Sequence, residues 1–481
     1  MNGADGRAKI VEERGARLDR ESPLRCGLDF ALPPIAALDR RRDLNAGCEV
    51  SVEERTGDLA RVRFAVGRRG DADVVRHGIR LSRLAPSQPS ACRRTGKPAR
   101  PLEALSVAWL TARYLIESEP ELIEKRANAL ALEQSVECPL EAIGSQFVLD
   151  EIVARVDQIK ELGERRYLVD VKIATATTGG EPAQLLNMIF GNCSLWENVR
   201  FVDVELPRDL LARFPGPRHG MAGIRELVGA RGRPLTATAT KPQGLPISEL
   251  ARLCRTFVLA GVDIVKDDHG IADQSYSPYA ERVQACQSAV VDASAETGKP
   301  AFYAPNLIGS PRALRERARI ARELGIRVVL VAPMLMGLPA FFDLVDEFPE
   351  FVYLAHPSFG GAGRIDTSLL FGKIFRLFGA DAVIFVNYGG RFAYSQEESL
   401  SIAEALRAPW GHVPPAMPVP AGGMLVERVP ELLDRYGPDS MLLIGGNLLI
   451  AREHLLERTR EFVTRVATHR FSETAAPAAT H

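Results

Sequence analysis

Short apolar runs alternate with amphipathic stretches along the second half of the chain. The runs predict eight β-strands, over residues 235–240, 262–266, 301–307, 327–332, 351–356, 382–387, 418–423 and 440–446. The stretches between and after them carry apolar residues at helical spacing and predict helices over residues 247–260, 278–297, 313–324, 338–348, 367–378, 396–407, 429–436 and 449–466. Eight strand–helix units in about 250 residues are typical of a (β/α)8 barrel, which we expect over residues 216–470. A doubly wound open sheet is the alternative, but it does not explain eight evenly spaced units.

The pattern ahead of the barrel is less regular and predicts a smaller domain. Helices are expected over residues 105–116, 120–131 and 181–189, and strands over residues 168–173 and 199–206. This mixture indicates an α+β domain of ferredoxin-like type over residues 102–215. The predicted fold class is therefore α/β, with a C-terminal (β/α)8 TIM barrel preceded by an α+β domain.

The first 101 residues form an arginine-rich extension. Weak alternation over residues 48–64 predicts short strands around a turn at Thr56 and Gly57. The extension is therefore either a small β-rich domain or disordered. Residues 471–481 are expected to be a disordered tail.

Composition limits the partners and the cellular location expected for the protein. Its 481 residues carry a formal net charge of −1, which gives no reason to expect a nucleic acid or a membrane as a partner. The seven cysteines are scattered and lack metal-binding spacing, which is typical of reduced thiols. Charges occur throughout the first 20 residues, and no apolar run is long enough to cross a bilayer. We therefore expect a cytoplasmic protein.

Ionisable residues gather where the second predicted strand ends. The apolar run that begins at Val262 is followed directly by Lys266, Asp267, Asp268 and His269. A (β/α)8 barrel places its chemistry at the C-terminal ends of its strands. A solvated strand-to-helix turn is the alternative explanation, but the other strand ends favour an active site.

Those other ends supply further polar residues and two glycine pairs. In chain order they are Lys241, Asn306, His356, Asn387 with Arg391, Gly422-Gly423 and Gly445-Gly446. The glycine pairs follow the last two strands, where backbone N–H groups can approach an anion closely, and they predict a phosphate site. Lys241 and Arg391 could flank the same phosphate from neighbouring loops.

This series of motifs resembles the large subunit of ribulose bisphosphate carboxylase (RuBisCO). It is more closely similar to the RuBisCO-like proteins, which do not fix CO2, and the resemblance covers residues 104–470. The motifs that carry it are Lys241-Pro242, the segment 261–268, His356, the loop 387–392, the two glycine pairs, Phe190-Gly-Asn192 and Glu133.

The resemblance implies roles for several of these residues. Lys266 matches the lysine that takes up CO2 as a carbamate and binds Mg2+, with Mn2+ as a possible substitute, and Asp268 matches a second metal ligand. Lys241 matches the lysine that moves a proton during enolisation. Glu133 and Asn192 match residues that complete the active site of the opposite subunit, so a homodimer with shared sites is expected.

Departures from the family pattern change the expected chemistry. His269 stands where a third carboxylate ligand is expected, and it is either a metal ligand or a general base. Three groups of the second phosphate site are replaced, by Pro357, Ile384 and Ala421, while Gln243 and Arg391 replace two lysines. Because a buried phosphate needs cations or donors, we expect a substrate with one phosphate and no carboxylation of ribulose bisphosphate.

The candidate residues support a leading hypothesis of metal-assisted enolisation. The catalytic candidates are Lys241, Lys266, His269 and His356, the metal ligands Lys266, Asp268 and His269, and the substrate-binding residues Asn387, Arg391, Gly422, Gly423, Gly445 and Gly446. Within the family, the Lys-Asp-Asp-His-Gly variant most resembles members that decarboxylate, or transcarboxylate and hydrolyse, 3-oxo-isoapionate 4-phosphate. The alternative is a methionine-salvage enolase or isomerase acting on a methylthio-sugar phosphate. A catalytically inactive scaffold is the alternative of another class.

Overall fold

The computed structural model describes residues 48–56, 59–66 and 108–471, and the chain divides into two compact units, Met1–Lys97 and Pro98–His481. In the first unit the expected strands are present as β1 (Cys48–Thr56) and β2 (Leu59–Val66), which pair antiparallel. The rest of the predicted extension and nearly all of the predicted tail lie outside the described residues. The expected domain boundaries stay predictions.

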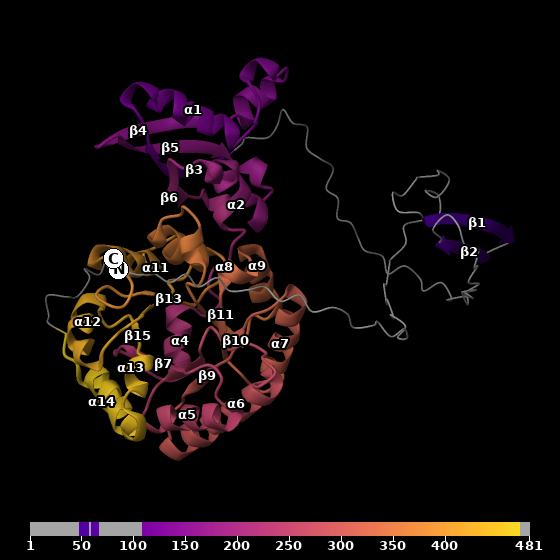
Figure 1. Ribbon diagram of the computed structural model, residues 1–481. Coiled ribbons are helices and arrows are strands. Elements are labelled where there is room, and N and C mark those ends of the chain that lie inside the picture. Colours follow the sequence, from indigo (N-terminus) through magenta and orange to yellow (C-terminus); the bar gives the residue numbers. More distant parts are fainter. Residues whose placement is uncertain (1–47, 57–58, 67–107, 472–481) are drawn as a thin grey trace, which may run out of the picture. The chain divides into compact units, whose positions relative to one another are not determined.

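The second unit begins with an antiparallel sheet of four strands in the order β4-β5-β3-β6 (Figure 1). The strands are β3 (Trp109–Glu117), β4 (Arg155–Gly163), β5 (Arg166–Ala174) and β6 (Val199–Glu205). The helices of this region are α1 (Ile123–Glu133), α2 (Pro182–Phe190) and α3 (Arg208–Leu211). Helix α1 packs against β4 and β5. This arrangement confirms the expected α+β domain.

One prediction in this domain was wrong, and one strand was not predicted. Residues 105–116 were expected to be helical, but Trp109–Glu117 is the strand β3, which lies between β5 and β6. A short, almost continuous apolar run fits a central strand as well as a buried helix, and here pairing on both sides decides. Strand β4 (Arg155–Gly163) was not predicted, because it is an edge strand that is mostly solvent-exposed and carries no apolar alternation.

The C-terminal region contains the expected parallel strands in chain order. They are β7 (Leu235–Thr240), β8 (Ile264–Asp267), β9 (Phe302–Ala304), β10 (Asn306–Leu307), β11 (Val328–Val331), β12 (Val352–Ala355), β13 (Ala382–Val386), β14 (Met417–Ala421) and β15 (Met441–Leu443). Hydrogen bonds join them in two arcs, β10 to β14 and β15-β7-β8-β9, so the last strand pairs with the first. The expected third strand is interrupted at Pro305, which has no N–H to donate.

Helices connect these strands largely where they were expected. They are α4 (Gly220–Val228), α5 (Ile247–Leu259), α6 (Tyr279–Thr297), α7 (Pro311–Glu323), α8 (Pro333–Met336), α9 (Leu338–Glu347), α10 (Phe375–Leu377), α11 (Gln396–Arg407), α12 (Val429–Tyr436), α13 (Gly446–Leu449) and α14 (Leu455–Thr468). The helix expected over 367–378 is instead a π-helix, η9 (Ser368–Ile374), that continues into α10. Among the described residues, none of the helices is long and apolar enough to span a membrane.

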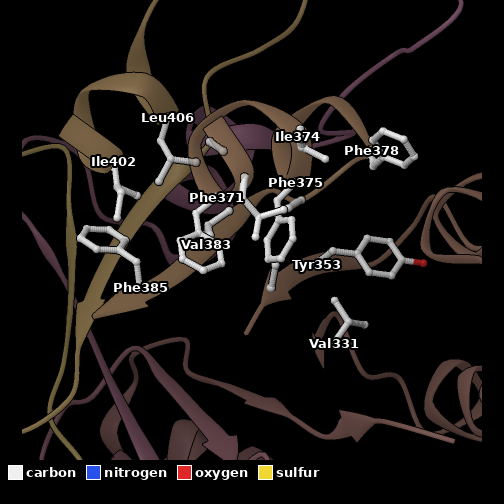
Figure 2. Close-up of a cluster of buried hydrophobic side chains, with 14 of the residues drawn as sticks. Val331, Tyr353, Phe371, Ile374, Phe375, Phe378, Val383, Phe385, Ile402 and Leu406 are labelled. Carbon is white, nitrogen blue, oxygen red and sulfur yellow. The ribbon is translucent and has the colours of Figure 1, made fainter. Parts of the chain in front are cut away.

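The parallel strands separate two apolar cores. Alternate residues such as Ala237, Ile264 and Leu354 form an inner core that also contains Ile224 and Val228 of α4. The other face of the strands packs against the helices. Figure 2 shows part of this outer core, where Phe371 and Phe375 of η9 and α10 lie over Val383 of β13. Because both faces are covered, these strands read as continuous apolar runs rather than as alternating patterns.

Candidate active site at the ends of the parallel strands

Strand alternation brings the predicted catalytic residues to the inner face. Ile264 belongs to the inner core, and side chains two and four positions further along a strand lie on the same side. Lys266 and Asp268 therefore continue the inner face of β8. By the same rule His356 continues from Leu354 on β12, and Lys241 continues from Ala237 on β7.

Asp268 is the centre of this group. The Lys241 Nζ lies 2.5 Å from the Asp268 Oδ1, and the His269 Nδ1 lies 3.3 Å from the same oxygen. The His269 ring stacks on the His356 ring with centroids 4.3 Å apart. Burial opposes ionisation of Asp268, but hydrogen bonds from His269 and Lys241 and the Lys266 charge outweigh it and hold the pKa of Asp268 well below its ordinary value. Asp268 is therefore a carboxylate at physiological pH.

Lys266 is buried beside this carboxylate, with 3% of its surface exposed. Its Nζ donates to the backbone oxygen of Asp267 at 3.0 Å. Burial, together with the positive charge of Lys241, lowers the pKa of Lys266 to about 8, although Asp268 opposes the shift. The uncharged amine, which is the form that reacts with electrophiles such as CO2, is therefore populated far more near neutral pH than in an ordinary lysine.

The His356 ring is held by Ser358, a residue of the loop that follows β12. Its Nδ1 accepts a hydrogen bond from the Ser358 N–H at 3.2 Å and lies 2.7 Å from the Ser358 Oγ. Burial, with the positive charge of Lys266, keeps the pKa of His356 far below its ordinary value, so the ring is neutral. Ser358 was not among the predicted site residues. The one sequence signal for it is its position two residues after His356.

The neighbouring aspartate has a different environment. Asp267 is fully buried and accepts hydrogen bonds from the Tyr303 hydroxyl at 2.6 Å, the Asn306 N–H at 3.2 Å and the Arg282 Nε at 3.3 Å. The Asn306 side chain in turn donates to the backbone oxygens of His269 and Ile271, both at 2.9 Å. Asp267 therefore supports the loop that carries Asp268 and His269 from behind the strand.

The unmodified side chains at these strand ends supply few ligands for a divalent metal. Within the part of the chain that the structure describes, no three His, Cys, Asp or Glu residues are grouped so that they could hold a metal ion. Asp268 is the one carboxylate of the group above, and it is already paired with Lys241. Mg2+ prefers several oxygen ligands, so its binding here would require a further oxygen donor.

The glycine pairs lie beside two different predicted residues. A Cβ at Gly423 would meet the Arg391 backbone nitrogen at 2.7 Å, and one at Gly445 would meet the Lys241 Cε at 3.5 Å. Gly422 and Gly423 have φ angles of 94° and 81°, which favour glycine. These pairs thus bring the Arg391 loop and Lys241 close to bare backbone.

Asn387 and Arg391, both predicted to bind substrate, have side chains in different surroundings. Asn387 is buried, where its amide donates to the Tyr388 backbone oxygen and accepts from the Tyr436 hydroxyl, each at 2.8 Å. Arg391 lies over the Phe392 ring, 4.9 Å from its centroid. Both polar atoms of the Asn387 side chain are thus hydrogen-bonded inside the protein. The side chain therefore anchors the start of the loop 387–392.

Glu133 and Asn192, the residues expected to serve a partner's site, contact each other. The Asn192 Nδ2 donates to the Glu133 Oε1 at 2.9 Å at an exposed position on the α+β domain. An open cavity of about 480 Å3 is lined by Glu133, Cys138 and Leu140 among others. A second hollow, of about 540 Å3, lies between α5 and α6, away from the strand ends.

Comparisons with known proteins agree with this geometry. The model of the ribulose bisphosphate carboxylase large chain, catalytic domain, matches residues 220–450. The 5-methylthioribulose-1-phosphate isomerase of Rhodospirillum rubrum is 49% identical over 359 residues, which cover 74% of this chain and 96% of the relative. The chain belongs to the RuBisCO large-chain family. Its similarity to RuBisCO-like proteins confirms the resemblance inferred from the motifs.

Two further RuBisCO-family members support the assignment. The crystal structure of a RuBisCO-like protein from Rhodopseudomonas palustris superposes with a TM-score of 0.71 at 48% identity and covers 76% of this chain and 99% of that chain. The 2,3-diketo-5-methylthiopentyl-1-phosphate enolase of Geobacillus thermodenitrificans is 35% identical over 364 residues, which cover 71% of this chain and 88% of the relative. The predicted fold class is thereby confirmed.

Proposed function

We propose that this RuBisCO-like protein is an enolase or isomerase of a methylthio-sugar phosphate. The observation that carries the proposal is the 49% identity to 5-methylthioribulose-1-phosphate isomerase over nearly its whole length. The leading hypothesis from the sequence, a reaction of 3-oxo-isoapionate 4-phosphate, gains no support from these relatives. They favour the alternative, and they also favour an enzyme over an inactive scaffold.

The inner face of the strands is consistent with a substrate that has one phosphate and one apolar end. Ile384 and Ala421 belong to the inner apolar core, at strands β13 and β14. A second phosphate there would lose its hydration without gaining a donor. A methylthio group carries no charge and suits such surroundings. We assign the phosphate to the glycine pairs, with Lys241 and Arg391 beside them.

Enolisation of a ketone requires a proton to leave carbon and the carbonyl oxygen to be stabilised. We assign proton transfer to Lys241, which is ion-paired with Asp268. Lys266, whose pKa of about 8 leaves part of it as the free amine, is assigned to the reaction with CO2. His356 is a neutral imidazole, and such a ring can donate a hydrogen bond to a carbonyl oxygen without first losing a proton.

Metal dependence is part of the proposal and depends on Lys266. A carbamate on Lys266 would add an anionic oxygen next to Asp268, and these two groups would then hold Mg2+ or Mn2+, with His269 beside them as a third ligand or as a base. A bound divalent ion supplies charge stabilisation for an enediolate. The His269 Nδ1 lies 3.3 Å from the Asp268 Oδ1, a position from which the imidazole could serve in either role.

A homodimer with shared sites is also proposed, supported by exposed apolar side chains. Around the strand ends these are Tyr276, Leu335, Phe359, Phe392, Leu425 and Ile450, of which Ile450 is 75% exposed. On the α+β domain, Leu195 is 77% exposed and lies three residues after Asn192. Contiguous exposed apolar side chains mark interaction surfaces, and Leu195 and Leu140 are exposed on the domain that carries the Glu133–Asn192 pair.

Phosphorus and proton NMR can test the proposed reaction directly. Purified protein with Mg2+ and bicarbonate would be incubated with 5-methylthioribulose 1-phosphate, and separately with 3-oxo-isoapionate 4-phosphate. We expect turnover of the methylthio-sugar alone, its loss in Lys266→Ala, and its retention in Lys160→Ala, which alters an exposed lysine of β4. Turnover of the sugar acid alone would overturn the proposal.

A further inference from the structure

The loop after β12 holds a tight turn next to His356. The Gly360 N–H donates to the Pro357 backbone oxygen at 2.9 Å, which closes a four-residue turn. Phe359, the third residue of the turn, has a φ of 67° although it is not glycine. Bulky residues rarely adopt this conformation, and they do so mainly where surrounding contacts impose it.

Contacts on both sides of the turn hold Phe359 in this conformation. The His356 N–H donates to the Val331 backbone oxygen at 2.7 Å, which fixes the entry from β12. On the other side, a Cβ at Gly360 would lie 2.6 Å from the Phe371 ring, so a larger residue does not fit at this position. Ser358 is therefore held in one orientation relative to His356.

Both polar groups of Ser358 that can donate lie next to the same ring nitrogen. The Ser358 N–H points at the His356 Nδ1 at 3.2 Å, and the Ser358 Oγ lies 2.7 Å from it. A backbone N–H can only donate, so the Nδ1 must present its lone pair. In a neutral imidazole the proton then resides on the Nε2.

We propose that Ser358 is a positioning residue that holds the His356 ring as the tautomer with its proton on Nε2. The ring becomes a fixed hydrogen-bond donor at its far nitrogen and cannot act as an acceptor there. Its role in turnover rests on the proposed function, in which His356 donates to the carbonyl oxygen of the substrate. The tautomer itself can be measured without any substrate.

The surroundings of the ring are consistent with this role. The His269 ring covers one face of His356 at 4.3 Å, and Lys266, Lys241 and Asp268 are the charged groups near it. Stacking fixes the plane of the ring, whereas Ser358 determines which nitrogen carries the proton. The two contacts therefore constrain different properties of one side chain.

Nitrogen NMR of the 15N-histidine-labelled protein tests the tautomer. The chain has eight histidines, and the His356 signals are assigned by their loss in His356→Gln. We expect the Nε2 to be protonated in the wild type. Ser358→Ala keeps the N–H but loses the hydroxyl, so the Nε2 should stay protonated while the Nδ1 shift moves because its shorter hydrogen bond is lost. A wild-type ring protonated on Nδ1 would overturn the proposal whether or not the proposed function holds.

Kinetics supply the second readout. Loss of one of two hydrogen bonds should lower kcat roughly tenfold in Ser358→Ala with little change in KM, and Ser358→Thr, which restores a hydroxyl, should recover most of it. Ser401→Ala removes a half-buried hydroxyl that bonds within α11 and serves as the matched control. Equal kcat in Ser358→Ala and the wild type, with unchanged nitrogen shifts, would show that Ser358 has no positioning role.

Discussion

Asp267 and Asp268 are adjacent in the chain but belong to separate networks. Asp268 faces the inner side of the strands, 2.5 Å from the Lys241 Nζ, whereas Asp267 is fully buried on the other side of β8 with Tyr303 and Arg282. Alternation along the strand causes this division. It assigns chemistry to one aspartate and structural support to the other, and two isosteric substitutions can separate these roles.

Asp268→Asn should abolish turnover of the methylthio-sugar phosphate while leaving the fold intact. The substitution removes the charge that pairs with Lys241 and His269 but preserves the shape of the side chain. We expect kcat to fall by at least a factor of about 100, with the thermal unfolding midpoint within a few degrees of the wild type. Activity close to that of the wild type would contradict the central position given to Asp268.

Asp267→Asn should instead destabilise the protein. Arg282 is completely buried beside Asp267, and removal of one member of a buried ion pair leaves the other without compensation. Such losses cost about 3–5 kcal/mol. Thermal unfolding followed by circular dichroism should show a clear decrease in midpoint. A midpoint equal to that of Asp268→Asn would mean that the Asp267 network does not support the loop.

Lys266→Met should stabilise the protein near neutral pH and less so in alkali. The lysine has a pKa of about 8 in the folded state and an ordinary value of 10.5. Folding therefore carries a penalty below pH 8 that fades as the pH rises to the ordinary value, because the unfolded chain then also loses the proton. The gain at pH 7 should be at most about 3 kcal/mol.

Unfolding midpoints in carbonate-free buffer at neutral and alkaline pH measure this effect. Lys160→Met serves as the matched control, because Lys160 lies exposed on β4 and should show no such dependence. A Lys266→Met protein that is less stable than the wild type at pH 7 would contradict the burial penalty assigned to Lys266.

Shared active sites predict complementation between two inactive proteins. Glu133→Gln alters the residue proposed to serve the partner subunit, and Lys266→Ala alters the strand end. In a mixed dimer one site receives both defects and the other neither. Co-expression of the two variants should therefore restore about a quarter of wild-type activity by random assortment. Restored activity would be absent if Glu133 served the site of its own subunit or if the chain were monomeric.

Elements with strong local signals could be predicted closely from the sequence. Helix α11 (Gln396–Arg407) was predicted with its observed bounds, and its start is determined locally, since the Ser395 side chain accepts from the Glu398 N–H. The strand β3 (Trp109–Glu117) could not be told from a helix, since its identity depends on partners far away in the chain.

The positions of the candidate site residues could be predicted where they follow from alternation along a strand, but not where they depend on loop conformation. Lys241, Lys266, Asp268 and His356 follow from the strand ends and were found together as expected. The burial of the Asn387 side chain depends on Tyr436, which lies 49 positions away. The contact of Ser358 with His356 depends on the backbone conformation of a turn, which the sequence alone does not determine.

Incorporation of solvent deuterium is the measurement that tests the proposed enolisation most directly. The substrate 5-methylthioribulose 1-phosphate would be incubated in D2O with the wild type and with Asp268→Asn, in the presence of Mg2+ and bicarbonate, and followed by proton NMR. We predict loss of the proton signal next to the carbonyl with the wild type and its persistence with Asp268→Asn. Persistence of that signal with both proteins, while the substrate is stable and bound, would contradict an enolising active site at these strand ends.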